Sequence, residues 1–76
     1  MTTQKLIENA KANNATVYFD KKDTDSIYVK FNNESMIHVF TIVTGDVFFN
    51  YSFDQKTSKV KESLSHELRV KKSLGF

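Results

Sequence analysis

The chain has 76 residues, of which 13% are aromatic, and a formal net charge of +2. This length allows one domain, which buries only about 60% of the surface that its unfolded chain exposes. The absence of cysteine excludes disulfides, thiolate metal sites and cysteine nucleophiles. A net charge this small does not by itself indicate nucleic-acid binding. The composition therefore predicts one small domain over residues 1–76 that is held together without disulfides.

The apolar runs are too short for a membrane segment. No stretch approaches the ~18 apolar residues of a membrane span, and residues 1–14 lack the apolar segment of a signal peptide. We therefore expect a cytoplasmic protein with no membrane contact. Pro, Cys and Trp are absent, while Lys, Asn and Phe are frequent. That usage is typical of AT-rich bacterial or phage genomes.

Residues 3–13 are predicted to form a short helix. Leu6, Ile7 and Ala10 share one face of it, and Thr2 or Thr3 can cap its first turn. The pair of asparagines at 13 and 14 ends the helix, since Asn tolerates the left-handed conformation that follows many helices.

Two strands are predicted next, over residues 16–20 and 26–31, with a polar loop at 21–25. The second strand alternates most clearly, because Ile27, Val29 and Phe31 share one face and Ser26, Tyr28 and Lys30 share the other. Residues 32–35 form a turn. Alternation of this kind predicts a sheet with one buried face.

Residues 36–53 are predicted to form a hairpin that turns at Gly45 and Asp46. A two-residue loop needs positive φ at one or both positions, which Gly adopts freely and Asp tolerates. The turn lies between two runs rich in Val, Ile and Phe, so the local signal for a hairpin is strong.

Residues 58–72 are predicted to form a second helix, capped by Ser58. Its apolar stripe is Val60, Leu64 and Leu68. A second stripe beside it contains Lys61, Ser65, Arg69 and Lys72.

The element order α-β-β-β-β-α predicts the fold class. Short loops between successive strands favour a four-stranded antiparallel meander, and two terminal helices on one face give a two-layer α+β sandwich. The sheet residues expected on the helix side are Val17, Phe19, Ile27, Val29, Phe31, Val47, Phe49, Tyr51 and Phe53. The helix residues expected to meet them are Leu6, Ile7, Ala10, Val60, Leu64 and Leu68.

The strand at 36–43 carries apolar residues on both faces, so one apolar set must point away from the helices. If the smaller set points inward, the open face consists of Tyr18, Tyr28, Lys30, His38, Phe40, Ile42 and Phe48. Such a patch usually marks an interface, and we interpret it as a binding face for another protein or for a second copy of the chain. Two alternatives are that the second helix covers this face, or that Tyr18, Tyr28 and Phe40 stack bases of single-stranded nucleic acid while Lys30 contacts phosphate.

The basic stripe of the second helix is an alternative binding site. Lys61, Arg69 and Lys72 could follow the phosphates of a nucleic acid. Glu62 and Glu67 dilute the positive charge, and cations near a helix C-terminus also complement the helix dipole. A solvated helix face is therefore the competing interpretation.

The sequence contains no catalytic, metal or cofactor signature. His38 and His66 lie in different predicted elements, without metal-ligand spacing. Asp20, Asp23 and Asp25 lack the central Gly and terminal Glu of a calcium loop. Two glycines cannot make a phosphate-cradling loop. We therefore expect a non-enzymatic interaction module of a phage or bacterial type that modulates or inhibits a larger protein, with nucleic-acid binding as the alternative.

Overall fold

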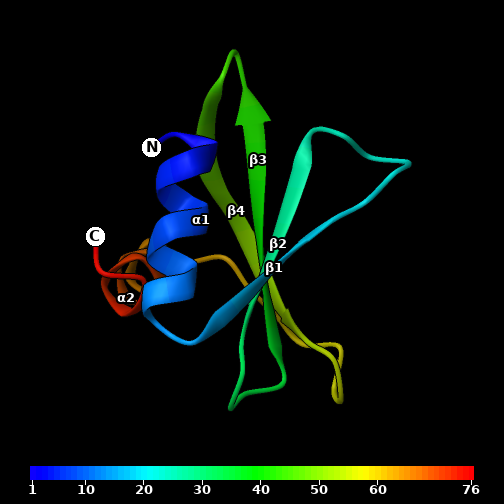
Figure 1. Cartoon of the computed structure of the whole chain (residues 1–76). Coiled ribbons are helices and arrows are strands. Elements are labelled where there is room, and N and C mark those ends of the chain that lie inside the picture. The colour runs from blue at the N-terminus through cyan, green and yellow to red at the C-terminus, as the bar shows by residue number, and fades with distance from the viewer.

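The computed structural model describes all 76 residues and shows two helices and a five-stranded antiparallel sheet (Figure 1). The elements are α1 (Thr3–Ala12), β1 (Ala15–Phe19), β2 (Ser26–Phe31), β3 (Met36–Val43), β4 (Asp46–Asp54), β5 (Val60–Lys61) and α2 (Leu64–Ser73). The strands are adjacent in chain order, β1 to β5. The predicted α+β meander with terminal helices is confirmed, and β5 is an addition to it.

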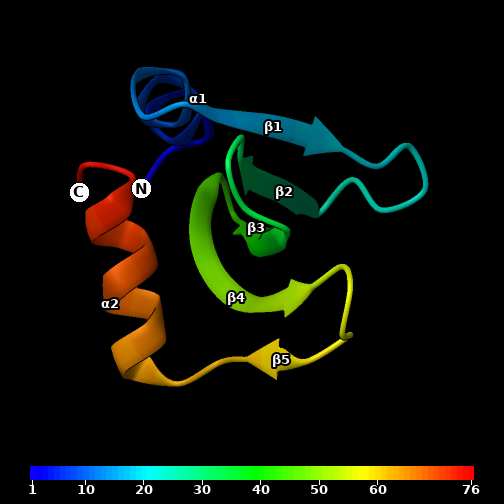
Figure 2. The same cartoon turned by 90° about the horizontal axis from the view of Figure 1, so that it is seen from below.

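Both helices lie on the same side of the sheet, which curls around β3 (Figure 2). Leu6 and Ala10 of α1 and Val70 and Leu74 at the end of α2 form one buried cluster with the inward side chains of the sheet. The sheet's contributions are Ala15, Ile27, Val29, Phe40 and Val47. Because the helices share one face, the opposite face has no covering layer. Neither helix is long or apolar enough to cross a bilayer.

The first helix begins and ends as predicted. The Thr2 hydroxyl accepts a hydrogen bond from the Lys5 amide at 3.1 Å, which satisfies one of the free amides of the first turn. Asn14 follows the helix with φ of +57°, the left-handed conformation that Asn tolerates. Leu6 and Ala10 are fully buried, so packing against the sheet holds this short helix in place.

The hairpin turn lies one residue earlier than predicted. Val43 pairs with Asp46, which leaves Thr44 and Gly45 as the two turn residues, with φ of +52° and +83°. Positive φ at both positions is the type I′ geometry, whose twist matches that of the flanking strands. Gly45 has the expected role, but Thr44 rather than Asp46 is its partner in the turn.

The inward set of β3 is the reverse of the predicted one. Phe40 pairs with Ile27 and Phe49, and His38 pairs with Val29, so these side chains face the helices. Phe40 is fully buried at the centre of the core, and Ile42 packs against that core. The predicted outward placement of His38, Phe40 and Ile42 is therefore wrong. The set with the larger side chains points inward, because burying the Phe40 ring between the sheet and the two helices removes the most apolar surface from water.

A bulge in β4 overturns a second prediction. Val39 pairs with Tyr51, but the next residue, Phe40, pairs with Phe49, so Asn50 is the extra residue. An extra residue switches every later side chain to the opposite face. Tyr51 and Phe53 therefore lie on the open face, although strict alternation predicted them on the helix side.

The C-terminal segment also differs from the prediction. Val60 and Lys61 pair with Phe53 and Ser52 as a short strand, and α2 begins only at Leu64, capped by the Ser63 hydroxyl. The predicted stripe of Val60, Leu64 and Leu68 is exposed, Leu64 to 70%. Val70 and Leu74 are buried in its place. Because Val60 and Lys61 pair with β4, the helix starts later than predicted. The face of α2 that packs against the sheet is the one with Val70 and Leu74.

Phe19 lies on the predicted side of the sheet, opposite the buried Ile27. It stands at the end of β1 and is 60% exposed, so it is not part of the core. Val17, Phe31 and Phe49 are partly buried against the core, as predicted.

Candidate functional site

Two features of the structure are candidate sites: a buried polar network on the helix side of the sheet, next to a pocket, and the uncovered opposite face. The network comprises Glu34, His38, Ser52 and His66. The uncovered face, called the outer face below, comprises Tyr18, Tyr28, Lys30, Phe48, Tyr51 and Phe53 around Ile37 and Val39.

The network is centred on the hydroxyl of Ser52, a residue with 0% exposure. Its Oγ lies 2.6 Å from Nδ1 of His38 and 2.7 Å from Nε2 of His66. Nε2 of His38 lies 2.8 Å from Oε1 of Glu34. These residues come from the β2–β3 turn, β3, β4 and α2, so the network connects α2 to the centre of the sheet.

Donor and acceptor counts fix the direction of these hydrogen bonds when His38 is neutral. A carboxylate only accepts, so Nε2 of His38 carries the proton that is donated to Glu34. Nδ1 then accepts from the Ser52 hydroxyl. Ser52 has a single hydrogen, so Nε2 of His66 must donate to Ser52 Oγ. No buried side-chain nitrogen or oxygen is left without a partner, as expected for a network that stabilises one arrangement of α2.

The order acid, histidine, serine does not create a hydrolase triad here. In that arrangement the serine contacts Nε2 of the histidine and the acid contacts Nδ1, whereas Ser52 contacts Nδ1 of His38 and Glu34 contacts Nε2. Ser52 is also inaccessible and is hydrogen-bonded by a second histidine. Its hydroxyl has no open side at which a substrate could react.

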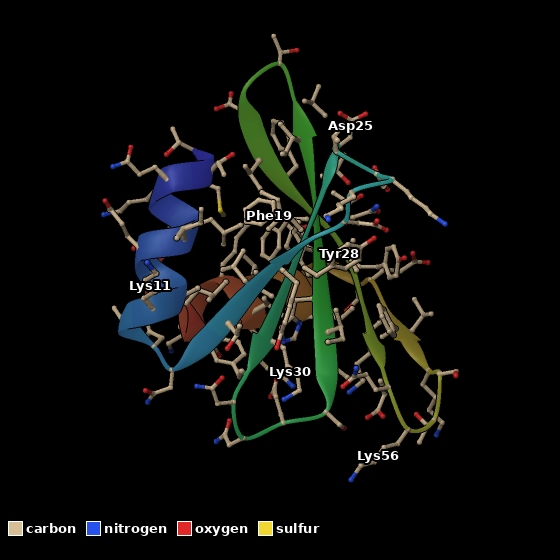
Figure 3. The ribbon with its side chains drawn as sticks, turned by 45° about the vertical axis from the view of Figure 1, so that its right-hand side comes forward. Lys11, Phe19, Asp25, Tyr28, Lys30 and Lys56 are labelled. Carbon is tan, nitrogen blue, oxygen red and sulfur yellow. The ribbon has the colours of Figure 1, made fainter.

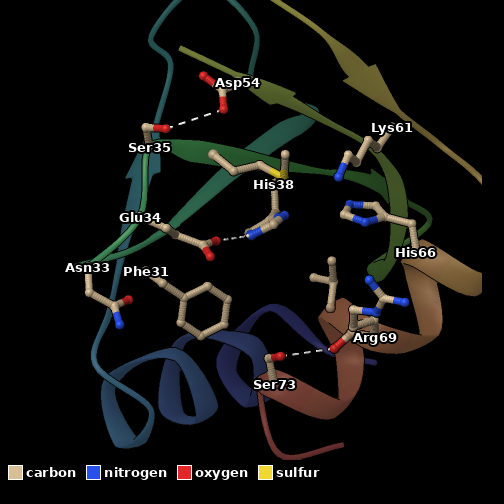
Figure 4. Close-up of a pocket in the computed structure, with 12 residues that line it drawn as sticks. Phe31, Asn33, Glu34, Ser35, His38, Asp54, Lys61, His66, Arg69 and Ser73 are labelled. Atoms are coloured by element: carbon tan, nitrogen blue, oxygen red, sulfur yellow. Dashed lines mark hydrogen bonds and ion pairs between the residues drawn. The ribbon is translucent and has the colours of Figure 1, made fainter. Parts of the chain in front are cut away.

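A pocket of about 510 Å³ lies beside the network (Figure 4). Glu34, His38 and Asp54 line it together with Lys61, His66 and Arg69. Lys61, His66 and Arg69 form a basic cluster on one side of the pocket, while Glu34 and Asp54 lie across from it (Figure 4). The structure therefore brings Lys61 and Arg69 of the predicted basic stripe together.

Lys72 does not line this pocket. Lys61 belongs to β5 rather than α2, so the helical spacing that suggested one continuous ridge does not exist. The predicted nucleic-acid residues are thus divided between a pocket wall and a separate exposed position.

The positive surroundings act on His66. Burial of its ring lowers the pKa of His66 below the ordinary 6.5, and the nearby charges of His38, Lys61 and Arg69 lower it further. The Glu34 carboxylate opposes this effect. The neutral form of His66 is therefore favoured in the folded protein.

Asp54 is fixed in the β4–β5 turn by its own hydrogen bonds. Its Oδ1 accepts the amides of Lys56 at 2.7 Å and Thr57 at 3.2 Å, and its Oδ2 accepts the Ser35 hydroxyl at 3.3 Å. The bond from the Lys56 amide is the main reason that the pKa of Asp54 lies below the ordinary 3.8.

The outer face is apolar and has no helix over it. Tyr18, Tyr28, Val39 and Tyr51 form one cross-strand row, and Lys30, Ile37 and Phe53 belong to the next. Val39 is only 2% exposed, so the larger side chains around it shelter it. Figure 3 shows Tyr28 and Lys30 on the side of the sheet remote from Lys11 of α1.

Four of the seven residues predicted for an open face lie there: Tyr18, Tyr28, Lys30 and Phe48. His38, Phe40 and Ile42 lie on the helix side, and Ile37, Val39, Tyr51 and Phe53 take their place. The sequence reasoning missed Tyr51 and Phe53 because nothing local marks Asn50 as a bulge. It also missed Glu34 and Ser52, since ordinary turn and strand residues acquire their partners only through strand pairing.

No group of three His, Cys, Asp or Glu side chains is arranged to bind a metal ion. Comparisons with protein families, with curated proteins and with solved structures find no match to this chain.

Proposed function

We propose that this protein is a non-enzymatic interaction module that modulates a larger protein by binding it through the outer face. The observation that carries this proposal is the position of both helices on one side of the sheet. The other side is left with three tyrosines, two phenylalanines and one lysine at its surface. Large uncovered apolar patches are uncommon on monomeric proteins and usually mark interfaces.

The composition of the outer face supports a protein partner. Tyr and Phe are enriched at protein interfaces, and Tyr is frequent among the residues that dominate binding energy. A standard interface takes about 800 Å² from each partner, which is about one sixth of the 5129 Å² surface of this chain. One face of a two-layered domain can supply that area.

The charge on the outer face suggests the chemistry of the partner. Lys30 is the only charged residue among those that define the face, and it is half-buried between Thr16 and Ile37 in its cross-strand row. Gln55 lines the same hollow as Tyr28 and Lys30, and Lys56 lines a second hollow together with Lys30 and Gln55. The partner surface that fits is apolar and carries a carboxylate opposite Lys30.

Photo-crosslinking in the source cell tests this proposal. A photoreactive phenylalanine analogue replaces Tyr28 or Phe53 in turn, with Lys11 on α1 as the matched control position. We expect both outer-face positions to cross-link to the same larger protein and Lys11 to give no such product. With that partner purified, Lys30→Glu should weaken binding about tenfold or more, and binding should weaken with salt.

Three results would contradict the proposal. The first is cross-linking only to a second copy of the chain, which would make the outer face a dimer interface. The second is an unchanged affinity of the purified partner for the Lys30→Glu variant. The third is labelling of single-stranded nucleic acid from Tyr28, which would indicate a base-stacking surface.

Nucleic-acid binding through Lys61, Arg69 and Lys72 has less support as the main function. These residues lie on two elements, and only Lys61 and Arg69 share the pocket. A basic groove that follows a phosphate backbone requires a continuous row of cations.

A further inference from the structure

We infer that the pocket beside the network binds a phosphate group between Lys61, His66 and Arg69. This site lies on the helix side of the sheet, so it is independent of the outer face. The pocket volume of about 510 Å³ falls within the range of small-molecule sites, roughly 300 to 1,000 Å³.

The two permanent cations of the pocket have no anionic partner. The chain contains two ion pairs, Glu34 with His38 and Glu67 with Lys71, and neither includes Lys61 or Arg69. The side chains of these two residues also make no hydrogen bond, since the contact of Arg69 with Ser73 uses its backbone carbonyl. Two cations and a histidine thus converge from β5 and α2, and neither cation forms an ion pair (Figure 4).

The carboxylates of the pocket are already engaged. Glu34 accepts the proton of His38 Nε2 at 2.8 Å. Asp54 accepts two backbone amides and the Ser35 hydroxyl. Their hydrogen bonds hold them on the wall opposite the basic cluster, so the free cationic donors of the pocket are those of Lys61 and Arg69.

A phosphate group matches these donors. The planar guanidinium of Arg69 can bind two phosphate oxygens at once, and the Lys61 ammonium supplies a compact charge beside it. A dianion also offsets the mutual repulsion among Lys61, Arg69 and a protonated His66. A phosphomonoester carries about −1.5 to −2 charges at pH 7, and its second pKa is about 6.

Phosphate binding should be linked to protonation of His66. The groups that face this ring are His38 on β3, Lys61 on β5, Arg69 on α2 and Glu34 in the β2–β3 turn. The three basic groups lower the pKa of His66, and a bound dianion would raise it. While the monoester remains a dianion, affinity should therefore increase as pH falls from 7.5, and binding should take up protons at His66. Near the second pKa of the ligand, about 6, loss of the ligand's own charge opposes this gain.

The phosphate can belong to a free phosphomonoester or to a nucleic-acid strand, and NMR titration separates these sources. The intact protein is titrated with inorganic phosphate, with glycerol 2-phosphate and with a twelve-nucleotide single-stranded DNA that lacks terminal phosphates. Sodium chloride keeps the ionic strength constant. The His66 ring signals and the backbone amides report binding, and the His66 signals also report its pKa.

We expect a saturable response to glycerol 2-phosphate that is centred on Lys61, His66 and Arg69, together with a raised His66 pKa. Arg69→Gln should weaken binding about tenfold or more, because a charge-assisted hydrogen-bonded pair is lost. Lys72→Gln is the matched control: it is an exposed position on the same helix, with the same change in net charge and no contact with the pocket. Both variants should keep the native circular dichroism spectrum.

The site would be overturned by a linear response without saturation, or by equal losses of affinity in Arg69→Gln and Lys72→Gln. DNA binding that depends equally on Arg69 and Lys72, without any response to the monoester, would also overturn it and would assign an extended nucleic-acid surface.

Discussion

His38 and His66 share the hydroxyl of Ser52: their ring centroids are 6.0 Å apart, and Ser52 Oγ lies within 2.7 Å of a nitrogen of each ring. One histidine comes from the middle of the sheet and the other from the first turn of α2. The hydroxyl can donate to only one of them, so the two rings must have complementary proton positions. This contact is the principal polar connection between α2 and the sheet.

Ser52→Ala should lower the free energy of unfolding by about 1–3 kcal/mol, because it leaves ring nitrogens of both histidines without a partner in a largely buried place. Urea denaturation measures the loss. Ser65→Ala, at an exposed position of α2, is the matched control and should change stability by no more than about 0.5 kcal/mol. Equal free energies of unfolding for the two variants would mean that the hydrogen bonds of Ser52 do not stabilise the fold.

Stability should fall as pH decreases through the range in which His66 titrates. The pKa of His66 is lowered in the folded protein, so the unfolded chain takes up its proton at a higher pH than the folded chain. The free energy of unfolding should decrease as pH falls below about 6.5, and this loss should be complete once pH is below the lowered pKa. Urea denaturation between pH 7.5 and pH 5 measures the effect.

His66→Gln is the control for this pH dependence, because Gln can still donate to Ser52 but does not titrate. The variant should have a flatter stability profile over the same pH range. Asp54 does not interfere, since its pKa lies below 3.8 and its contribution is lost only at more acidic pH. Identical profiles for the wild type and the variant would contradict the assignment to His66.

Thr44→Asn should stabilise the protein by about 0.5–1 kcal/mol. Thr44 adopts φ of +52°, which is unfavourable for a β-branched residue, whereas Asn-Gly is the preferred pair in a type I′ turn. Gly45→Ala should destabilise by about 1–2 kcal/mol. An added Cβ at Gly45 meets nothing within 4 Å, so its cost would come from backbone conformation alone. A lower melting temperature for Thr44→Asn would contradict this description of the turn.

Phe40→Ala should cost about 3–5 kcal/mol, as for other large aromatic residues in a core. Phe48→Ala is the paired variant on the outer face, where the side chain is 53% exposed, and it should cost less than about 1 kcal/mol. Chemical denaturation of the two variants compares the two faces of the sheet. Similar losses of unfolding free energy for the two variants would contradict the burial of Phe40 on the helix side and the exposure of Phe48 on the outer face.

The local prediction worked where one face of an element is clearly polar. The strand at 26–31 alternates without ambiguity, so Ile27 and Val29 were correctly assigned to the core and Tyr28 and Lys30 to the outer face. The strand at 36–43 is apolar on both faces, and alternation alone cannot identify the buried set. Its orientation is fixed by pairing with β2, where Ile27 and Phe40 are opposite each other.

The sequence by itself determined the number and order of the main elements, the hairpin at Gly45 and the caps of α1, because each depends on neighbours within a few residues. Only the tertiary structure decided the bulge at Asn50, the pairing of Val60 and Lys61 with β4, and the stripe of α2 that is buried. These features result from contacts between segments distant along the chain. The Ser52 network and the basic cluster depend on the same contacts, so no local pattern could predict them.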